Sequence, residues 1–283
     1  MSQPVQLARP DDLGLKVPVP PGGEWFMLAE GDSWFSFGSV LGNSLLNQLR
    51  FTRRTLVVST SRPGDTLRRM VDWRRDPKFV ALVDGGRRGN LAHRFDALLL
   101  SAGGNDLIDA AGGQFVDQQL FRRIGEGETP GSAADCLHED AWQRFEAYLR
   151  ANFAAVAALV GNSRRNADTP ILIHGYDYPT PNDTPTLRGV SGPWLRPAMV
   201  AHRIPEALWA PLADLLIDRL AGVLGTLALP NVHFIDTRGT LVRAERDARG
   251  ASGDWLNEIH PTAPGYAKLA RKWQPAVETR LRA

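Results

Sequence analysis

Four residues that could together perform acyl transfer stand in separate parts of the chain. Ser33 ends a Gly-Asp-Ser sequence, Asn105 lies within Gly-Gly-Asn-Asp, and His260 precedes a proline. Gly64 lies between the serine and the asparagine. A serine can supply a nucleophile, a histidine can take its proton, and amide donors can hold the oxyanion that forms on an attacked carbonyl. These residues predict an acyl-transfer site if the fold brings them together.

The order and approximate spacing of these four blocks resemble the SGNH (GDSL) esterase/lipase family, which is named for its serine, glycine, asparagine and histidine. The resemblance covers residues 26–275. It implies a cofactor-free ester hydrolase in which Ser33 is the nucleophile and His260 is the general base. The backbone N–H groups of Ser33 and Gly64 and the side-chain amide of Asn105 would form the oxyanion hole. The Gly-x-Ser-x-Gly sequence of the ordinary α/β-hydrolases is absent.

The residue that should orient the histidine is where this sequence departs from the family. The family places an aspartate three residues before the histidine, and that position here is Asn257. We expect Asp254, further upstream, to orient His260, because a carboxylate stabilises the imidazolium that forms. Asn257 is the alternative, since its amide oxygen can accept a bond from Nδ1–H. Two further candidates for this role are Glu258 and Asp236.

Each of the four residues also has a purely structural interpretation. Ser33 could cap a helix, Asn105 could turn the chain, and His260 could mark the entrance to the last helix. Because all four occur together and in order, the catalytic interpretation is favoured.

The elements that must position these residues follow from the pattern of apolar residues. Short apolar runs, each followed by glycine, serine or aspartate, are typical of strands buried on both faces. Such runs occur at residues 25–29, 55–58, 97–100, 171–173 and 232–235. Helical spacing predicts helices over residues 140–162, 205–228 and 262–273. The alternation predicts a three-layer, flavodoxin-like α/β fold, with a parallel five-stranded sheet and helices on both faces.

Ligands of such a sheet bind outside the carboxyl ends of the strands, which is where the substrate should lie. Trp34, His174 and Asp177 stand at these ends and are candidate substrate-binding residues. Residues 109–139 and 177–204 do not fit the alternation, and we expect both to be loops over the active face.

Length and composition indicate one globular domain. The 283 residues are 43% hydrophobic and 23% charged, and no linker interrupts them. We therefore expect a single domain over residues 1–283, in which residues 1–22 are an N-terminal extension. The N-terminus lacks the basic and then apolar pattern of a signal peptide, which predicts a cytoplasmic protein, and no apolar run is long enough to span a membrane.

Cysteine content and charge argue against several other classes of function. The lone Cys136 excludes an internal disulfide and a cysteine-based zinc site, and no cluster of ligands along the sequence predicts a metal or another cofactor. Lysine and arginine number 33 against 31 acidic residues, and the two signs are interleaved. A nucleic-acid partner is therefore not expected.

A serine hydrolase that cleaves a carboxylic ester through an acyl-enzyme is the predicted function. Its substrate would be a small-molecule, lipid or sugar ester. An acyltransferase would use the same serine and histidine. A non-catalytic acyl- or carbohydrate-binding domain is the other alternative, and only Asn257 favours it. The sequence carries no signal for the ester's chain length or for the oligomeric state.

Overall fold

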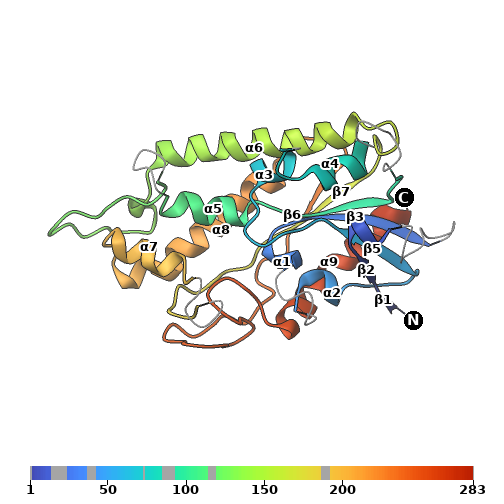
Figure 1. The fold of residues 1–283 in the computed structure, drawn as a ribbon. Helices are drawn as coiled ribbons and strands as arrows, with labels where there is room; N and C mark the ends of the chain where they lie inside the picture. Colours follow the sequence, from blue (N-terminus) through green and yellow to red (C-terminus); the bar gives the residue numbers. More distant parts are fainter. Residues whose placement is uncertain are drawn as a thin grey trace.

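A parallel sheet of six strands forms the centre of the molecule (Figure 1). The computed structural model describes residues 2–13, 24–36, 43–72, 74–84, 93–113, 119–185 and 192–282. The six strands are β2 (Gln6–Ala8), β3 (Trp25–Gly31), β5 (Thr55–Ser59), β6 (Ala97–Ser101), β7 (Ile171–His174) and β8 (Val232–Ile235). They lie in the order β2-β5-β3-β6-β7-β8, and all neighbours are parallel.

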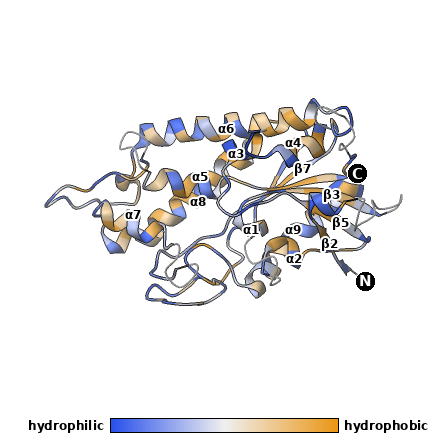
Figure 2. Ribbon diagram, viewed as in Figure 1, coloured by the Kyte–Doolittle hydropathy of each residue, from blue (hydrophilic) through white to orange (hydrophobic). Residues whose placement is uncertain are grey.

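The five predicted strands are all present, and their order confirms the predicted fold class. Numbered along the chain, these five strands take the order 2-1-3-4-5 of a flavodoxin-like sheet. Every residue of β3, β6 and β7 is buried. Strands covered on both faces read as continuous apolar runs, which is why the sequence revealed them. The same strands form the apolar centre in Figure 2.

The sixth strand comes from residues 1–22, which were expected to be an N-terminal extension. Within this segment β2 adds to the sheet beside β5, and β1 (Gln3–Pro4) pairs antiparallel with β4 (Arg50–Phe51). A three-residue Gln-Leu-Ala strand at a sheet edge carries no apolar run, so the sequence pattern could not reveal it. Residues 14–23 lie outside the described part of the chain.

Helices cover both faces of the sheet. Figure 1 shows α3, α4 and α6 above the sheet and α1, α2 and α9 below it, with α7 at the end opposite the two chain termini. The described α-helices are α1 (Ser33–Ser36), α2 (Leu45–Gln48), α3 (Leu67–Val71), α4 (Pro77–Asp84), α5 (Gly104–Ala111), α6 (Glu139–Gly161), α7 (Leu195–Ala201), α8 (Trp209–Gly225) and α9 (Ala263–Arg282). Short 3₁₀ turns occur at Pro10–Asp12, Ala134–Cys136 and Glu206–Leu208.

The predicted helices are confirmed with shifted ends. The first is α6, the second begins as a 3₁₀ turn and continues as α8, and the last is α9, which extends to Arg282. The two expected loops are partly helical. Residues 109–139 begin inside α5, and residues 177–204 contain α7. Parts of both segments, residues 114–118 and 186–191, lie outside the described residues.

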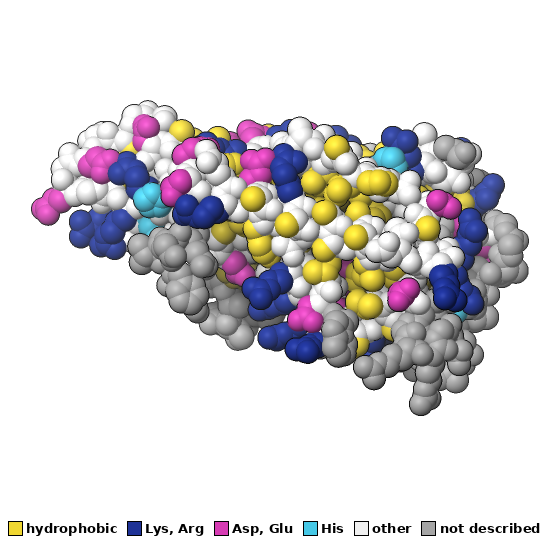
Figure 3. Space-filling view, turned by 90° about the horizontal axis from the view of Figure 1, so that it is seen from above, with side chains coloured by type: hydrophobic (Ala, Val, Ile, Leu, Met, Phe, Trp, Pro, Cys, Tyr) yellow, Lys and Arg dark blue, Asp and Glu magenta, His cyan; other side chains and the backbone are white. Residues whose placement is uncertain are grey.

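The surface of the described chain carries mixed charge. On the face seen in Figure 3, basic and acidic side chains lie scattered around a central area of apolar side chains. Cys136 is buried as a free thiol. None of the helices in the described ranges has the length and apolar content needed to cross a membrane.

Candidate active site

The turn after β3 holds Ser33 in a fixed position. Asp32 is buried and accepts hydrogen bonds on both of its carboxylate oxygens. Oδ1 accepts from the Trp34 N–H at 2.9 Å and from the Ser101 hydroxyl at 2.7 Å, and Oδ2 accepts from the Tyr176 hydroxyl. Burial raises the pKa of Asp32 to about 6. Asp32 therefore fixes the backbone on either side of Ser33, the first residue of α1.

Two strands approach closely at the end of β3. A Cβ on Gly31 would lie 2.7 Å from the Cβ of Ser101 and 2.8 Å from its carbonyl oxygen. Only glycine fits at such an approach. The glycine of the Gly-Asp-Ser sequence is thus explained by packing against β6.

His260 contacts Ser33 through one ring nitrogen and Asn257 through the other. The distance from Nε2 to the Ser33 Oγ is 2.8 Å, and the distance from Nδ1 to the Asn257 Oδ1 is 3.0 Å. The backbone N–H groups of Ile259 and His260 donate to the same Oδ1 at 3.1 and 2.9 Å. Because an N–H group can only donate, these bonds fix which end of the amide is oxygen. They also place the imidazole proton on Nδ1, which leaves Nε2 free to accept from the serine hydroxyl.

The prediction that Asp254 orients the histidine is wrong. Its Oδ2 accepts from the Val242 N–H at 2.6 Å and from the Lys268 ammonium at 2.6 Å. The chain closes a tight turn in which the Leu256 N–H donates to the His260 carbonyl at 2.8 Å. This turn brings the third residue before the histidine, and not the sixth, to Nδ1.

The other two candidates for this role also lie elsewhere. Glu258 accepts from backbone N–H groups at the start of α7, and Asp236 is paired with Arg238. The hydrogen-bond partner of the imidazole Nδ1 is therefore the neutral amide of Asn257. Burial lowers the pKa of His260 to about 3, so this histidine is held as a neutral base.

Asn105 and Gly64 lie on segments that are joined by a hydrogen bond. The Asn105 side-chain amide donates to the carbonyl of Asp65 at 2.9 Å, and this amide also lies on the cavity beside Ser33. The residue before Asp65 is Gly64, which has a φ of +80°. Glycine adopts this left-handed conformation without strain. Asn105 can thus give one amide hydrogen to the Gly64 loop and direct the other toward the cavity.

A mainly apolar cavity of about 50 Å³ lies against Ser33. Its walls come from the turn after β3 and from α5, α7 and α8. Side chains that line it include those of Leu107, Ile108, Leu195, Leu216, Ile217 and Trp255. Gly64 is not among the lining residues.

The three candidate substrate-binding residues have different positions. Trp34 lines the cavity and donates from its indole to the Ile259 carbonyl at 3.0 Å. Asp177 also borders the cavity, but both of its oxygens accept backbone N–H groups, three of them from residues 239–241.

His174 lies behind Trp34 and does not line the cavity. Its ring stacks on the Trp34 indole with centroids 5.5 Å apart. The expectation that His174 binds substrate is therefore wrong, because β7 directs this side chain into the aromatic core under the site.

Sequence reasoning missed two residues beside the site. Tyr176 lines the cavity and holds Asp32, and its place just after β7 was a signal that could have revealed it. Trp194 contacts His260 edge to face, with ring centroids 5.9 Å apart. Nothing in the local sequence distinguishes Trp194 from a loop residue.

Comparison with known proteins supports the fold. No family model and no curated protein matches the chain. A lipase from a goat rumen metagenome matches in structure with 14% identity and a TM-score of 0.52, covering 91% of this chain and 99% of that one.

Two further structures match with TM-scores below 0.5. A protein of Parabacteroides merdae described as a GDSL-like lipase has 12% identity and a TM-score of 0.47, with 90% and 96% covered. A variant of an acetyl xylan esterase from Geobacillus stearothermophilus has 16% identity and a TM-score of 0.44, with 92% and 94% covered. At these identities the likeness concerns the fold alone. The chain has a parallel-sheet α/β fold similar to that of the rumen lipase.

Proposed function

We propose that this protein is a serine hydrolase that cleaves carboxylic esters through an acyl-enzyme. The main support is the 2.8 Å contact between the Ser33 hydroxyl and His260, with the imidazole held by Asn257 in the tautomer that accepts the serine proton. An ester hydrolase needs this pair beside a site for the acyl group, and the apolar cavity lies against Ser33.

The proposed reaction runs in two halves. The Ser33 oxygen attacks the ester carbonyl while its proton passes to His260, and the oxyanion faces the N–H groups of Ser33 and Gly64 and the amide of Asn105. Collapse of the tetrahedral species breaks the bond to the alcohol, which leaves with the proton from His260. In the second half a water molecule gives its proton to His260 and attacks the acyl-serine. Collapse then releases the acid and returns the proton to Ser33.

The size of the cavity suggests the length of the acyl group. A volume of about 50 Å³ accommodates roughly three to five water-sized groups. The lining is mostly aliphatic, so we infer a short, uncharged acyl chain in the substrate.

The first experiment compares hydrolysis of p-nitrophenyl esters of increasing chain length by the wild type and by Ser33→Ala. We expect activity to be highest with short acyl chains and to fall by about 10⁴-fold or more in the variant. The matched control is Ser36→Ala, which removes another hydroxyl from helix α1. Within the described residues this hydroxyl donates to the Asp32 carbonyl. Turnover by Ser33→Ala equal to that of the control would exclude the serine mechanism.

A second candidate function, a non-catalytic acyl-binding domain, is favoured by the neutral Asn257 alone. A fluorophosphonate probe separates the two functions because it reacts only with an activated serine. Stoichiometric labelling of the wild type, and none of Ser33→Ala, supports the hydrolase. Failure of the probe to label, together with retained ester binding, supports the binding domain.

A further inference from the structure

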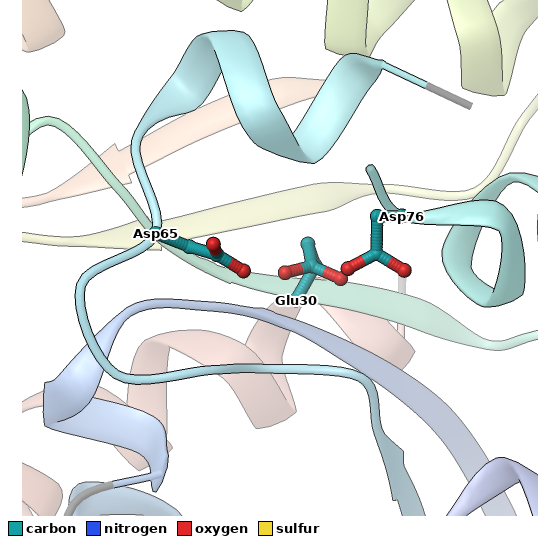
Figure 4. A group of neighbouring side chains, drawn as sticks. All are labelled: Glu30, Asp65 and Asp76. Atoms are coloured by element: carbon teal, nitrogen blue, oxygen red, sulfur yellow. The ribbon is translucent and has the colours of Figure 1, made fainter. Parts of the chain in front are cut away.

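Three carboxyl groups from distant parts of the sequence meet behind the candidate active site. They belong to Glu30 near the end of β3, Asp65 in the loop after β5, and Asp76 directly before α4. Each offers an oxygen, and the three oxygens lie within 4.8 Å of one another. Figure 4 shows Glu30 between the two aspartates, with the three carboxyl groups directed toward one another. No metal site was expected from the sequence, because these residues are not neighbours along the chain.

One oxygen in this group is buried and has no hydrogen-bond donor. Asp76 is 1% exposed, and its Oδ1 accepts from the Phe79 N–H at 3.1 Å, but its Oδ2 has no hydrogen-bond partner among the residues that the structure describes. The Nη2 of Arg62 lies 3.5 Å from this Oδ2, on a side chain that is 47% exposed. A buried carboxylate oxygen without a donor is costly, and an ion is one of the few ways to satisfy it.

The hydrogen-bond donors to Glu30, the central member of the group, carry no charge. Glu30 is fully buried, and its oxygens accept from the Gly31 N–H at 2.8 Å and from the Thr60 hydroxyl, both of which are neutral. Burial and the nearby charge of Asp76 raise the pKa of Glu30 well above its ordinary value. Arg62 acts on both aspartates, Arg69 acts on Asp65 and Lys78 acts on Asp76, and all three of these cations are exposed.

We propose that Glu30, Asp65 and Asp76 bind a divalent cation of the calcium type. Three carboxylates are the oxygen ligands that hard cations take, and Ca²⁺ binds such oxygens at about 2.3–2.6 Å. Oxygens up to 4.8 Å apart can therefore surround one Ca²⁺ ion. Mg²⁺ requires near-octahedral geometry and gives up its water ligands reluctantly, so a site made of three protein carboxylates favours Ca²⁺. Asp65 is only partly buried, so this member of the group is in contact with solvent.

The cation would fix the loops that form the active site. Asp65 follows Gly64, and its carbonyl accepts the amide of Asn105. Glu30 lies on β3, three residues before Ser33. A bound ion would thus join the nucleophile turn to the oxyanion loop. This consequence for activity rests on the proposed function, whereas binding of the ion does not.

The test is calorimetric titration of the full-length, chelator-treated protein with Ca²⁺, with Mg²⁺ in a parallel arm. We expect one site with a Kd between about 10⁻⁶ and 10⁻³ M, weaker binding of Mg²⁺, and a Tm that rises with Ca²⁺ concentration. Asp65→Asn and Asp76→Asn should each weaken Ca²⁺ binding at least ten-fold. Asn at position 76 keeps the oxygen that accepts the Phe79 N–H, so helix α4 retains its cap.

Two control variants separate the outcomes. Asp72→Asn removes a charge from the same segment but lies outside the cluster, and it should bind Ca²⁺ like the wild type. Ser33→Ala should bind Ca²⁺ like the wild type. Ca²⁺ binding is thus tested independently of ester hydrolysis, and either proposal can fail without the other. The absence of Ca²⁺ binding by folded wild-type protein would overturn the proposal and indicate a proton shared between the carboxyl groups. Unchanged binding by Asp65→Asn, the more exposed position, would overturn it equally.

Discussion

At the scale of single residues, Asn257 determines how His260 can act. Replacing a triad aspartate by asparagine usually costs about 10⁴-fold in rate because the imidazole takes the wrong tautomer. Here two backbone N–H groups hold the Asn257 oxygen toward the ring, so the productive tautomer is kept. What is missing is the charge that would stabilise the imidazolium. The rate cost of the neutral partner should therefore be well below 10⁴-fold.

Restoring the carboxylate tests this argument. In Asn257→Asp the new charge should raise the pKa of His260 and increase kcat/KM at pH 8 by about ten-fold. The acid limb of the pH profile should move to higher pH. The second oxygen would replace Nδ2, which is buried and has no hydrogen-bond partner among the described residues, so the free energy of unfolding should fall.

The control for this substitution is Asn257→Ala, which removes every acceptor at Nδ1. It should lower kcat/KM by about 10²-fold or more with little change in KM. Equal activity of the alanine and wild-type proteins would mean that Asn257 does not position the histidine.

The wild-type pH profile follows from the buried histidine. Burial lowers the pKa of His260 to about 3, so the neutral form that accepts the serine proton persists far below the ordinary value of 6.5. We expect kcat/KM to stay within about two-fold between pH 8 and pH 5. The measurement uses an ester whose hydrolysis is followed at a pH-independent wavelength. A half-maximal point near pH 6.5 would show that the imidazole is more hydrated than its burial indicates.

At the scale of elements, Glu258 connects the histidine segment to α7. Its carboxylate accepts from the N–H groups of Leu195 at 2.9 Å and Arg196 at 2.8 Å, and also from that of Trp194. These are donors at the start of the helix that have no partner within it. The same contact places the Trp194 ring against His260.

Glu258→Gln should loosen this connection. Glutamine offers one acceptor oxygen and directs an N–H₂ group at backbone donors. We expect the free energy of unfolding to fall by about 2–3 kcal/mol and KM to rise more than kcat falls, because Trp194 borders the site. Urea unfolding and steady-state kinetics measure the two effects. The exposed Glu245→Gln is the matched control, and equal stability of the two variants would contradict the role of Glu258.

The elements that the sequence predicted share a physical property. The central strands are buried on both faces and α6 carries a long apolar stripe, so their patterns were visible along the chain. The strand β2 and the helix α7 are short, and they are held by pairing and by Glu258 respectively. Contacts of this kind leave no periodic signal.

The same limit applied to the candidate site. Ser33, Asn105 and His260 stand beside element ends, which could be located from the sequence. The choice between Asp254 and Asn257 depended on a turn closed by backbone hydrogen bonds, which local composition does not encode.

At the scale of the whole molecule, an aromatic cluster joins the sheet to the site. His174 on β7 is fully buried, and its ring lies against those of Trp34, Phe35, Tyr176 and Trp273. Its Nδ1–H donates to the Gly175 carbonyl at 2.8 Å, whereas Nε2 has no hydrogen-bond partner in the described part of the chain. Burial therefore disfavours the protonated form of this imidazole in the folded protein.

This burial makes stability depend on pH in a calculable way. The pKa of His174 is lowered by burial to about 4, against an ordinary value of 6.5 in the unfolded chain. Between these two pKa values the unfolded chain binds more protons than the folded protein. The stabilisation associated with neutral His174 is therefore fully present above pH 6.5 and is lost as the pH falls toward 4. By proton linkage the loss between pH 8 and pH 5 is about 2 kcal/mol for this one group.

His174→Phe should remove that dependence while keeping an aromatic ring in the cluster. The Gly175 carbonyl still accepts from the Thr237 hydroxyl, so no acceptor is left unpaired. Urea unfolding of both proteins at pH 8 and pH 5 gives the difference directly, and the wild type should lose about 2 kcal/mol more than the variant. Buried carboxylates with a raised pKa change the free energy of unfolding in the opposite direction as the pH falls. They are present in both proteins, so their effect cancels in the comparison. Equal losses in the two proteins would mean that the His174 imidazole accepts a proton in the folded state.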